Sequence, residues 1–471
     1  MAFQSFAFIL LFLPFVIIVY RTLASRFSTA AANAFLLLAS AVFYIQSSLT
    51  NAILLAVSIL FNAVIGKRIR NVPEPSAWFW LITGVSANVL FLCYFKYAAF
   101  LFATAAPFLG LPANWMGKAA FPLGISFFTI QQIIYLVDVY ERLCEPNSIF
   151  DHSLIVSYFP YVSAGPITRI RDMVKQLHAP RNADGGGDVA LGLLRFSLGL
   201  FKKVVLADTI AIVVNAGFDQ PGSLSLVEGW LTCFLYTIQL FLDFSGYSDM
   251  AIGIARMLGH GLPENFNNPL TATSLTEFWQ RWHMTLTNFI TNYLYTPIVR
   301  SWGKVTRQKA MTATLLAMAI AGIWHGSGIT FLIFGLLHGV GLASHLAWKG
   351  AKKKMPNLAG TVLTLLLVCF AFLFFRSPDM TSATKMLAAI SGGQGFGSLS
   401  ILTPALKSNW RITALICALG PLVAFMGPST GQFAKTCQFT KPLAFAVAGA
   451  LLVSLLFLNS IPEKGFIYVG F

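Results

Sequence analysis

Long, uninterrupted apolar runs are the feature of this sequence that most restricts its fold. The first three runs cover residues 3–20 and 29–45 and a third stretch that ends at Lys67-Arg68-Ile69-Arg70. A helix of about 20 apolar residues crosses the hydrocarbon core of a bilayer and satisfies its own backbone hydrogen bonds. The runs do not alternate as the strands of a membrane barrel do. Because only 10% of the 471 residues are charged and 56% are hydrophobic, we predict an all-α, polytopic integral membrane protein.

Further runs bring the expected total to roughly 10 to 12 transmembrane helices. These runs cover residues 77–94, 97–111, 121–140, 226–242, 310–324, 329–348, 358–375, 412–426 and 443–458. Residues 154–164 are too short to span, which predicts a re-entrant or interfacial piece shielded by protein. Lys202 and Lys203 interrupt the stretch at 191–214, so it forms either two short elements or an amphipathic helix with snorkelling lysines. No long polar segment intervenes, so we predict one domain over residues 1–471.

The net charge of +15 fits a membrane protein whose Lys and Arg residues face the cytoplasm and anionic lipid. No basic face with a stacking module is visible, which argues against a nucleic-acid partner. The six cysteines lack CxxC spacing and HExxH is absent. We therefore predict neither a metal site nor a bound cofactor.

The segment TSLTEFWQRWHMTL, residues 273–286, is too polar to span and too aromatic for a solvated loop. Ser274 and Glu277 have the spacing of a capping box, which predicts a helix that begins there. On that helix Glu277 and Arg281 are positioned to pair, and Trp279 and His283 share a face. One interpretation is an interfacial helix with its tryptophans at headgroup level. The other is a catalytic segment that contains His283.

A second segment, GIWHGSG at residues 322–328, places His325 between two apolar runs. His325 follows Lys309 by sixteen residues, about 24 Å of helix, so it lies deep in the bilayer. An ionisable group at that depth needs a partner, a wet cavity or a function. Basic residues flank both ends of the pair of runs, so both ends are expected to be cytoplasmic: Arg300, Lys304, Arg307, Lys309, Lys349, Lys352, Lys353 and Lys354.

At these residues the chain resembles the membrane-bound O-acyltransferase (MBOAT) family, and within it the branch that acetylates alginate. The matching stretches lie between residues 121 and 471, in the family order: FPLGISFFTIQQIIYLVDVYE, YFPYVSAGPITR, DFSGYSDMAIGIARMLG, NFNNPLTATSLTEFWQRWHMTL, GIWHGSG with LLHG, and FIYVGF. The helices of residues 1–120 are less diagnostic. Gln280 and Thr285 stand where the family often has a basic residue and a serine.

The resemblance implies a helical fold around a central tunnel, with the invariant histidine at His325. A second position, usually His, Asn or Asp, maps onto His283. These two residues are the predicted catalytic pair. Polar and aromatic residues of the matching stretches are candidates for substrate or acyl binding: Trp282, Arg281, Trp324, Asp243, Ser245, Tyr247, Gln131 and His338. His338 also fits a core histidine that is hydrogen-bonded to a carbonyl on the neighbouring helix.

The implied reaction moves an acetyl group from cytoplasmic acetyl-CoA to an exported polysaccharide such as alginate. The implied location is the bacterial inner membrane, in contact with lipid. A periplasmic SGNH-hydrolase-like protein is the expected partner. Three alternatives stay open: transfer of D-alanyl or another acyl group to a cell-envelope polymer, a polysaccharide-export transporter, and a scaffold without acyl transfer. A transporter would show repeated halves with broken helices, and none is evident.

Overall fold

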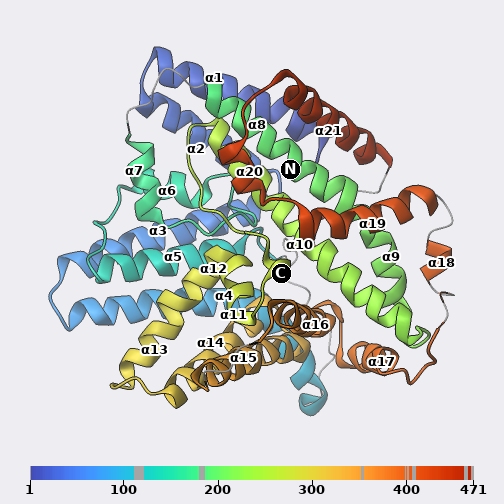
Figure 1. The fold of residues 1–471 in the computed structure, drawn as a ribbon. Coiled ribbons are helices and arrows are strands. Elements are labelled where there is room, and N and C mark those ends of the chain that lie inside the picture. Colours follow the sequence, from blue (N-terminus) through green and yellow to red (C-terminus); the bar gives the residue numbers. More distant parts are fainter. Residues whose placement is uncertain are drawn as a thin grey trace. The chain divides into compact units, whose positions relative to one another are not determined.

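The computed structural model describes residues 2–110, 121–179, 186–351, 355–397, 399, 402–405, 410–460 and 465–467 (Figure 1). Every regular element in these ranges is helical, which confirms the all-α class. Lys352, Lys353 and Lys354 and the end of the closing motif (468–471) lie outside the described residues. The described residues form two compact units, the first within 2–196 and 248–263 and the second within 197–247 and 264–467. The expectation of one domain stays a prediction.

Six helices among the described residues are long and apolar enough to cross a membrane. A seventh is added if the bent pair Trp410–Met426 and Thr430–Thr436 forms one span. The six are Ala7–Arg26, Leu49–Asn71, Ser76–Ala106, Ile329–Gly350, Asn357–Arg376 and Lys441–Asn459. Two further apolar helices, Thr29–Ile45 and Ile125–Tyr140, are shorter. These numbers confirm a polytopic protein, although fewer helices meet the length criterion than the 10 to 12 expected.

The first unit is built from the N-terminal helices. They are η1 (Ala7–Phe12), α1 (Leu13–Arg26), α2 (Thr29–Ile45), α3 (Leu49–Asn71), α4 (Ser76–Leu109), α5 (Ile125–Tyr140), α6 (Ile149–Ser157), α7 (Ile170–Leu177), most of α8 (Gly186–Leu200) and the end of α10 (Leu226–Met257). Serine side chains start α2 and α3, because Ser28 and Ser48 accept the first free amide protons of each helix. His260 lies in the core, where its two ring nitrogens meet the hydroxyls of Tyr158 and Tyr20 at 2.8 and 3.3 Å. The predicted non-spanning piece is the short helix α6 followed by a buried turn.

The second unit contains both predicted histidine segments. Its helices are η2 (Phe201–Ala207), α9 (Asp208–Asp219), the first part of α10, η3 (Pro269–Thr271), α11 (Leu275–Arg281), α12 (Met284–Phe289), η4 (Ile290–Tyr295), α13 (Thr296–Ser301), α14 (Arg307–His325), α15 (Ile329–Gly350), α16 (Asn357–Arg376), α17 (Met380–Ile390), α18 (Leu402–Ala405), α19 (Trp410–Met426), α20 (Thr430–Thr436) and α21 (Lys441–Ser460).

Glycines let α14 and α15 approach closely as an antiparallel hairpin (Figure 1). A Cβ on Gly322 would come within 2.4 Å of the Phe331 carbonyl oxygen, and one on Gly335 within 2.3 Å of the Met318 carbonyl oxygen. At the other end of the hairpin, a Cβ on Gly350 would come within 2.3 Å of the Arg307 guanidinium. The first residue of α14 and the last of α15 therefore lie together, as the flanking basic residues predicted. The break between the two helices falls at 326–328, directly after His325.

Replacing Gly335 by valine should force the hairpin apart, because the new side chain has no space beside Met318. Overpacking of this kind costs roughly 1–3 kcal/mol. Gly449→Val is the matched control, since Gly449 is also helical but nothing lies within 4 Å of an added Cβ there. Thermal unfolding in detergent measures both variants. Equal melting temperatures for the two would contradict the close packing of this hairpin.

Candidate active site

The segment around His283 is two short helices, not one. Ser274 starts α11 by accepting the Glu277 amide proton at 3.3 Å, and the Glu277 carboxylate accepts the Thr273 amide proton at 2.7 Å. Arg281 pairs with Glu277 as predicted. The helix then ends, because Trp282 is extended and His283 has a positive φ of 40°. The expectation that Trp279 and His283 share one helical face is therefore wrong.

Residues 265–267 cause this break by pairing with the backbone around His283. The Asn267 amide donates to the Arg281 carbonyl at 2.9 Å, and the Met284 amide donates to the Asn265 carbonyl at 2.9 Å. These two bonds cap the end of α11 and the start of α12. Helix α11 therefore ends where the backbone of residues 265–267 supplies hydrogen bonds to the free carbonyl and amide groups around His283.

The side chain of Asn265 fixes the tautomer of His283. Its Oδ1 accepts from the Thr285 hydroxyl at 2.9 Å and lies 3.4 Å from the Thr285 amide nitrogen, so this atom is the amide oxygen. His283 Nδ1 lies 3.0 Å from the same oxygen and must donate to it. Burial lowers the pKa of His283 to about 3, because the imidazolium loses its hydration. The ring is therefore neutral, with its lone pair on Nε2.

His325 is the last residue of α14 and is 2% exposed. Its ring packs against Trp324 at 4.8 Å, Phe375 at 5.3 Å and Phe334 at 5.9 Å between centroids. The break after it allows the chain to turn without covering the ring with a further helical turn. The structure thus presents a buried imidazole at a helix end, lined on three sides by aromatic rings.

His338 lies on α15 and is fully buried. Its Nδ1 accepts the indole N–H of Trp279 at 3.3 Å. An indole N–H only donates, so the ring proton of His338 is on Nε2. Within the described residues Nε2 has no hydrogen-bond partner. The predicted alternative of a bond to a neighbouring helix is thus correct in kind, although the partner is an indole.

One aromatic cluster, defined by Phe278, Trp282, Phe334, Phe372 and Phe375, contacts both His325 and His338. Phe372 lies at its centre, 5.3 Å from Trp282 and 5.6 Å from Phe334. Phe334 contacts both His325 and His338. His283 follows Trp282 directly and packs edge-on against Phe244 at 4.7 Å. His325 and His338 therefore contact the cluster directly, whereas the ring of His283 is linked to Trp282 through Phe244 and Phe266.

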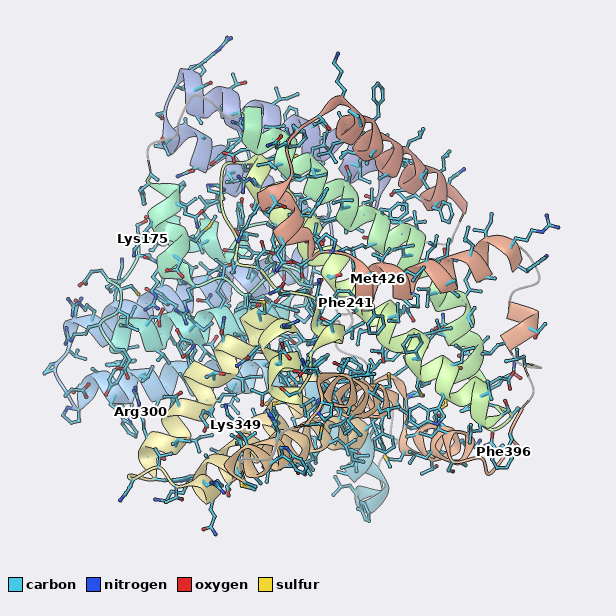
Figure 2. All side chains as sticks on the ribbon, in the orientation of Figure 1. Lys175, Phe241, Arg300, Lys349, Phe396 and Met426 are labelled. Atoms are coloured by element: carbon cyan, nitrogen blue, oxygen red, sulfur yellow. The ribbon has the colours of Figure 1, made fainter. Side chains whose placement is uncertain are left out.

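The remaining aromatic and basic candidates divide between this region and other roles. Trp282 is 1% exposed and central to the cluster, beside Phe241 of α10, which Figure 2 labels. Trp324 packs on His325. Arg281 is engaged by Glu277 and by the Thr271 hydroxyl at 3.2 Å, and its side chain is one-third exposed.

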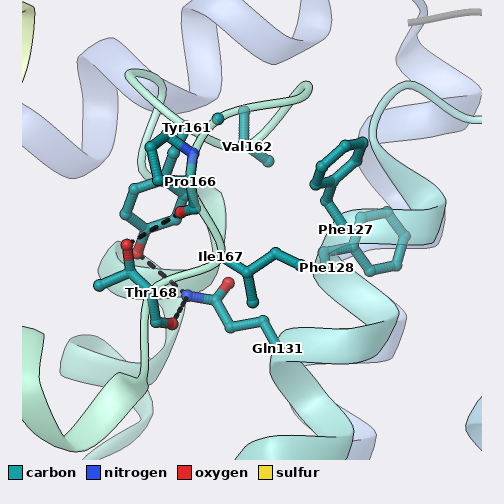
Figure 3. A pocket seen from close by; sticks show the side chains of 9 residues that line it. Phe127, Phe128, Gln131, Tyr161, Val162, Pro166, Ile167 and Thr168 are labelled. Atoms are coloured by element: carbon teal, nitrogen blue, oxygen red, sulfur yellow. Dashed lines mark hydrogen bonds between the residues drawn. The ribbon is translucent and has the colours of Figure 1, made fainter. Parts of the chain in front are cut away.

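Gln131 lies in the first unit, on α5. Its amide donates to the Tyr161 hydroxyl at 3.2 Å and to the Thr168 carbonyl at 3.0 Å, beside a cavity of about 10 Å³ (Figure 3). That volume holds about one water molecule. These bonds join α5 to the buried turn after α6, so they give Gln131 a structural task. Its predicted role in substrate binding stays a prediction.

The candidates on α10 differ in their surroundings. Asp243 accepts from Lys203 Nζ at 2.5 Å, and Lys203 also donates to Asp208 at 2.8 Å. The second oxygen of Asp243 accepts the Ile467 amide at 3.1 Å, which holds the C-terminal residues. Lys203 is 1% exposed, so the snorkelling interpretation is wrong for it: two buried carboxylates already satisfy its charge.

Two other α10 candidates are also buried. Tyr247 packs edge-on against Phe466 at 4.4 Å, near the same C-terminal residues. The Ser245 hydroxyl is buried and has no hydrogen-bond partner within the described ranges. Ser245 follows Phe241 by one helical turn, and Phe241 contacts Trp282. Of the three α10 candidates, Ser245 is therefore the one placed toward the aromatic cluster.

The sequence did not reveal the contacts of several residues, because their partners are close only in the folded protein: Asn265, Thr285, Lys203, Asp208, Phe334, Phe372 and Phe375. Asn265 stands in NFNNPL, a stretch that signalled the family but not a contact with His283. The ring partners on α16 have no local signal, because apolar residues every three or four positions also describe any packed helix.

Replacing Lys203 by methionine should destabilise the second unit by about 3–5 kcal/mol, because two buried carboxylates lose their counter-charge. Asp243→Asn should cost less, since Lys203 keeps Asp208 and the amide oxygen still accepts from Ile467. Thermal unfolding of both single variants and the double variant gives the coupling between them. Wild-type stability in both, with only substrate turnover lost, would instead assign Asp243 to substrate binding.

The chain is similar to known membrane acyltransferases. The model of the MBOAT, membrane-bound O-acyltransferase family, matches residues 75–375. The chain is 34% identical to a peptidoglycan O-acetyltransferase of Helicobacter pylori, over 93% of this chain and 91% of that protein. It is 35% identical to a probable alginate O-acetylase of Pseudomonas aeruginosa, over 91% and 81%. A teichoic acid D-alanyltransferase of Bacillus subtilis is 26% identical, over 54% of this chain and 68% of that protein.

The matched region includes α5, α10, α11 and the hairpin of α14 and α15, and it ends at Phe375, whose ring packs on His325. The similarity to the two acetyltransferases extends over nearly the whole chain. With its apolar helices and its buried histidines, the chain therefore belongs to the membrane-bound O-acyltransferase family and is a multi-pass membrane O-acyltransferase.

Proposed function

We propose that the protein transfers an acetyl group from acetyl-CoA to a hydroxyl on the periplasmic side, that of a partner protein which passes the group on to an exported polysaccharide, with His325 and His283 as the catalytic pair. The observation that carries this proposal is the burial of both imidazoles among aromatic rings of the second unit. His325 packs on Phe334 and Phe375 of the cluster, and His283 packs on Phe244, which is linked to Trp282 through Phe266. Such a region excludes water, which protects a thioester from hydrolysis and strengthens every polar contact within it.

In the proposed reaction His325 is the general base. It takes the proton of the attacking hydroxyl as the oxygen adds to the thioester carbonyl. The C–S bond then breaks, the ester forms, and the proton passes to the departing thiolate of CoA. Donor and acceptor react only when both are held at the same point, so orientation supplies much of the rate.

The tautomer of His283 suggests its part in this reaction. Because Nδ1–H is committed to Asn265, the Nε2 lone pair is suited to accept a hydrogen bond from the incoming hydroxyl and orient it. Stabilising the carbonyl oxyanion would instead require a donor at Nε2, and burial opposes the protonation that would provide one. We therefore assign His283 to the hydroxyl rather than to the acyl oxygen.

Acetyl is the proposed acyl group because the relatives matched over nine-tenths of this chain are named for O-acetylation. The relative named for D-alanyl transfer matches over about half of it. The relatives are named for peptidoglycan, alginate and teichoic acid and come from bacteria, and we propose a bacterial inner membrane location for this chain. Every regular element among the described residues belongs to the two helical units, and none forms a further domain that could hold the polymer. This supports a separate periplasmic acceptor protein of the SGNH-hydrolase type.

Replacing His325 by alanine should lower acetyl transfer about 100- to 10,000-fold, the usual contribution of a general base. Release of CoA from labelled acetyl-CoA by the purified protein, with the polysaccharide and the periplasmic partner present as acceptors, measures the loss. His178→Ala is the control, because His178 is exposed and paired with Asp151 in the first unit. Size-exclusion profiles in detergent establish that both variants fold. Normal turnover by folded His325→Ala protein would refute the assignment.

The partner is tested in liposomes that contain acetyl-CoA inside and polysaccharide outside. The chain alone should leave the polymer unacetylated, because the acetyl group has no carrier to the polymer. Addition of the periplasmic partner should restore the product, detected by mass spectrometry of the glycan. Complete acetylation by the chain alone would exclude an obligatory carrier while leaving the enzyme assignment intact.

A further inference from the structure

A cavity of about 250 Å³ lies in the second unit among α11, η4, α14 and α15, separate from the rings around His325. Trp279 forms one wall, and Leu342 and Leu346 of α15 form another. Leu346 is 37% exposed, so the cavity opens on the outer face of α15. That helix is long and apolar enough to span a membrane. The opening therefore faces the hydrocarbon that surrounds such a helix.

The lining excludes a charged occupant. Every residue that lines the cavity is uncharged, and its polar members are mostly threonines. Their hydroxyl protons are already used: Thr291 donates to the Thr287 carbonyl at 2.8 Å, and Thr314 to the Ala310 carbonyl at 2.9 Å. Thr276 is bound to His345 at 2.7 Å. Thr287 donates to the Trp282 carbonyl at 3.3 Å. All four threonine hydroxyls are thus already hydrogen-bonded, and an alkyl chain can lie against them without breaking a bond.

The hairpin end next to the cavity carries unpaired positive charge. Arg307 begins α14 and lies against Gly350 at the end of α15, and Lys349 precedes that glycine. Arg300 and Lys349 are both labelled in Figure 2. Within the described part of the chain, none of Arg300, Lys304, Arg307 and Lys349 forms an ion pair with a carboxylate.

The cavity lies close enough to the basic side chains of Arg307 and Lys349 for one amphipathic molecule to reach both. Thr314 lies seven residues from Arg307, about 10 Å along α14, and Leu346 lies three residues from Lys349, about 5 Å along α15. We propose that this cavity binds one acyl chain of an anionic phospholipid, whose phosphate lies on Arg307 and Lys349. The site is independent of the acyl-transfer chemistry proposed above.

Native mass spectrometry of the full protein tests this site, with phosphatidylglycerol and phosphatidylcholine of equal chain length as probes. Phosphatidylglycerol should bind about tenfold more tightly, because basic side chains attract the anionic headgroup. Thr314→Trp should fill the cavity and abolish that preference. Thr312→Trp is the matched control, since Thr312 is exposed on the same helix and does not line the cavity.

The headgroup contact is tested with the double variant Arg307→Gln and Lys349→Gln, which should bind both lipids equally. The double variant Lys435→Gln and Lys441→Gln, which also removes two exposed positive charges, on α20 and α21, should retain the preference. Melting temperatures show that each variant folds. Equal binding of the two lipids by the wild type, or retention of phosphatidylglycerol by Thr314→Trp, overturns the proposal. Displacement of the lipid by acetyl-CoA also overturns it, because the cavity would then belong to the acyl donor.

Discussion

The region of the predicted chemistry depends on one amide oxygen, Oδ1 of Asn265. It accepts hydrogen bonds from the ring N–H of His283 and from the hydroxyl of Thr285. The backbone carbonyl of Asn265 accepts the amide proton of Met284. A buried imidazole would otherwise exchange its proton between two nitrogens and rotate. Held in this way, it presents one nitrogen with a defined protonation state and direction, and the ends of α11 and α12 are fixed by the same contact.

The aromatic rings give the histidines their environment. Phe334 and Phe372 of α15 and α16 contact His325, His338 and Trp282, so helices far apart in sequence contribute to one water-poor region. A polar group buried there interacts strongly with whatever reaches it, because no solvent competes. The same burial would be costly for a permanent charge. Lys203, a buried cation on η2, is accordingly paired with two carboxylates, those of Asp208 and Asp243.

Local signals in the sequence predicted much of this arrangement. The spacing of Ser274, Glu277 and Arg281 predicted the start of α11 and its ion pair. The two apolar runs at 310–324 and 329–348 predicted separate helices on either side of His325. Apolar run length gave the polytopic class. The end of α11 was not predictable, because Asn265 lies eighteen positions before His283 and competes with helical periodicity only after folding. Lys203 and Asp243 are likewise forty positions apart. The catalytic assignment of the two histidines stays a prediction.

The left-handed backbone at His283 limits which side chains can replace it. Residues with a short polar side chain, asparagine and aspartate above all, adopt this conformation with little strain, whereas β-branched residues do so at considerable cost. An exchange of histidine for asparagine would therefore alter the reacting group without disturbing the path of the chain. The positive φ at position 283 thus limits the residues that can replace histidine there without strain, and with them the reacting groups available.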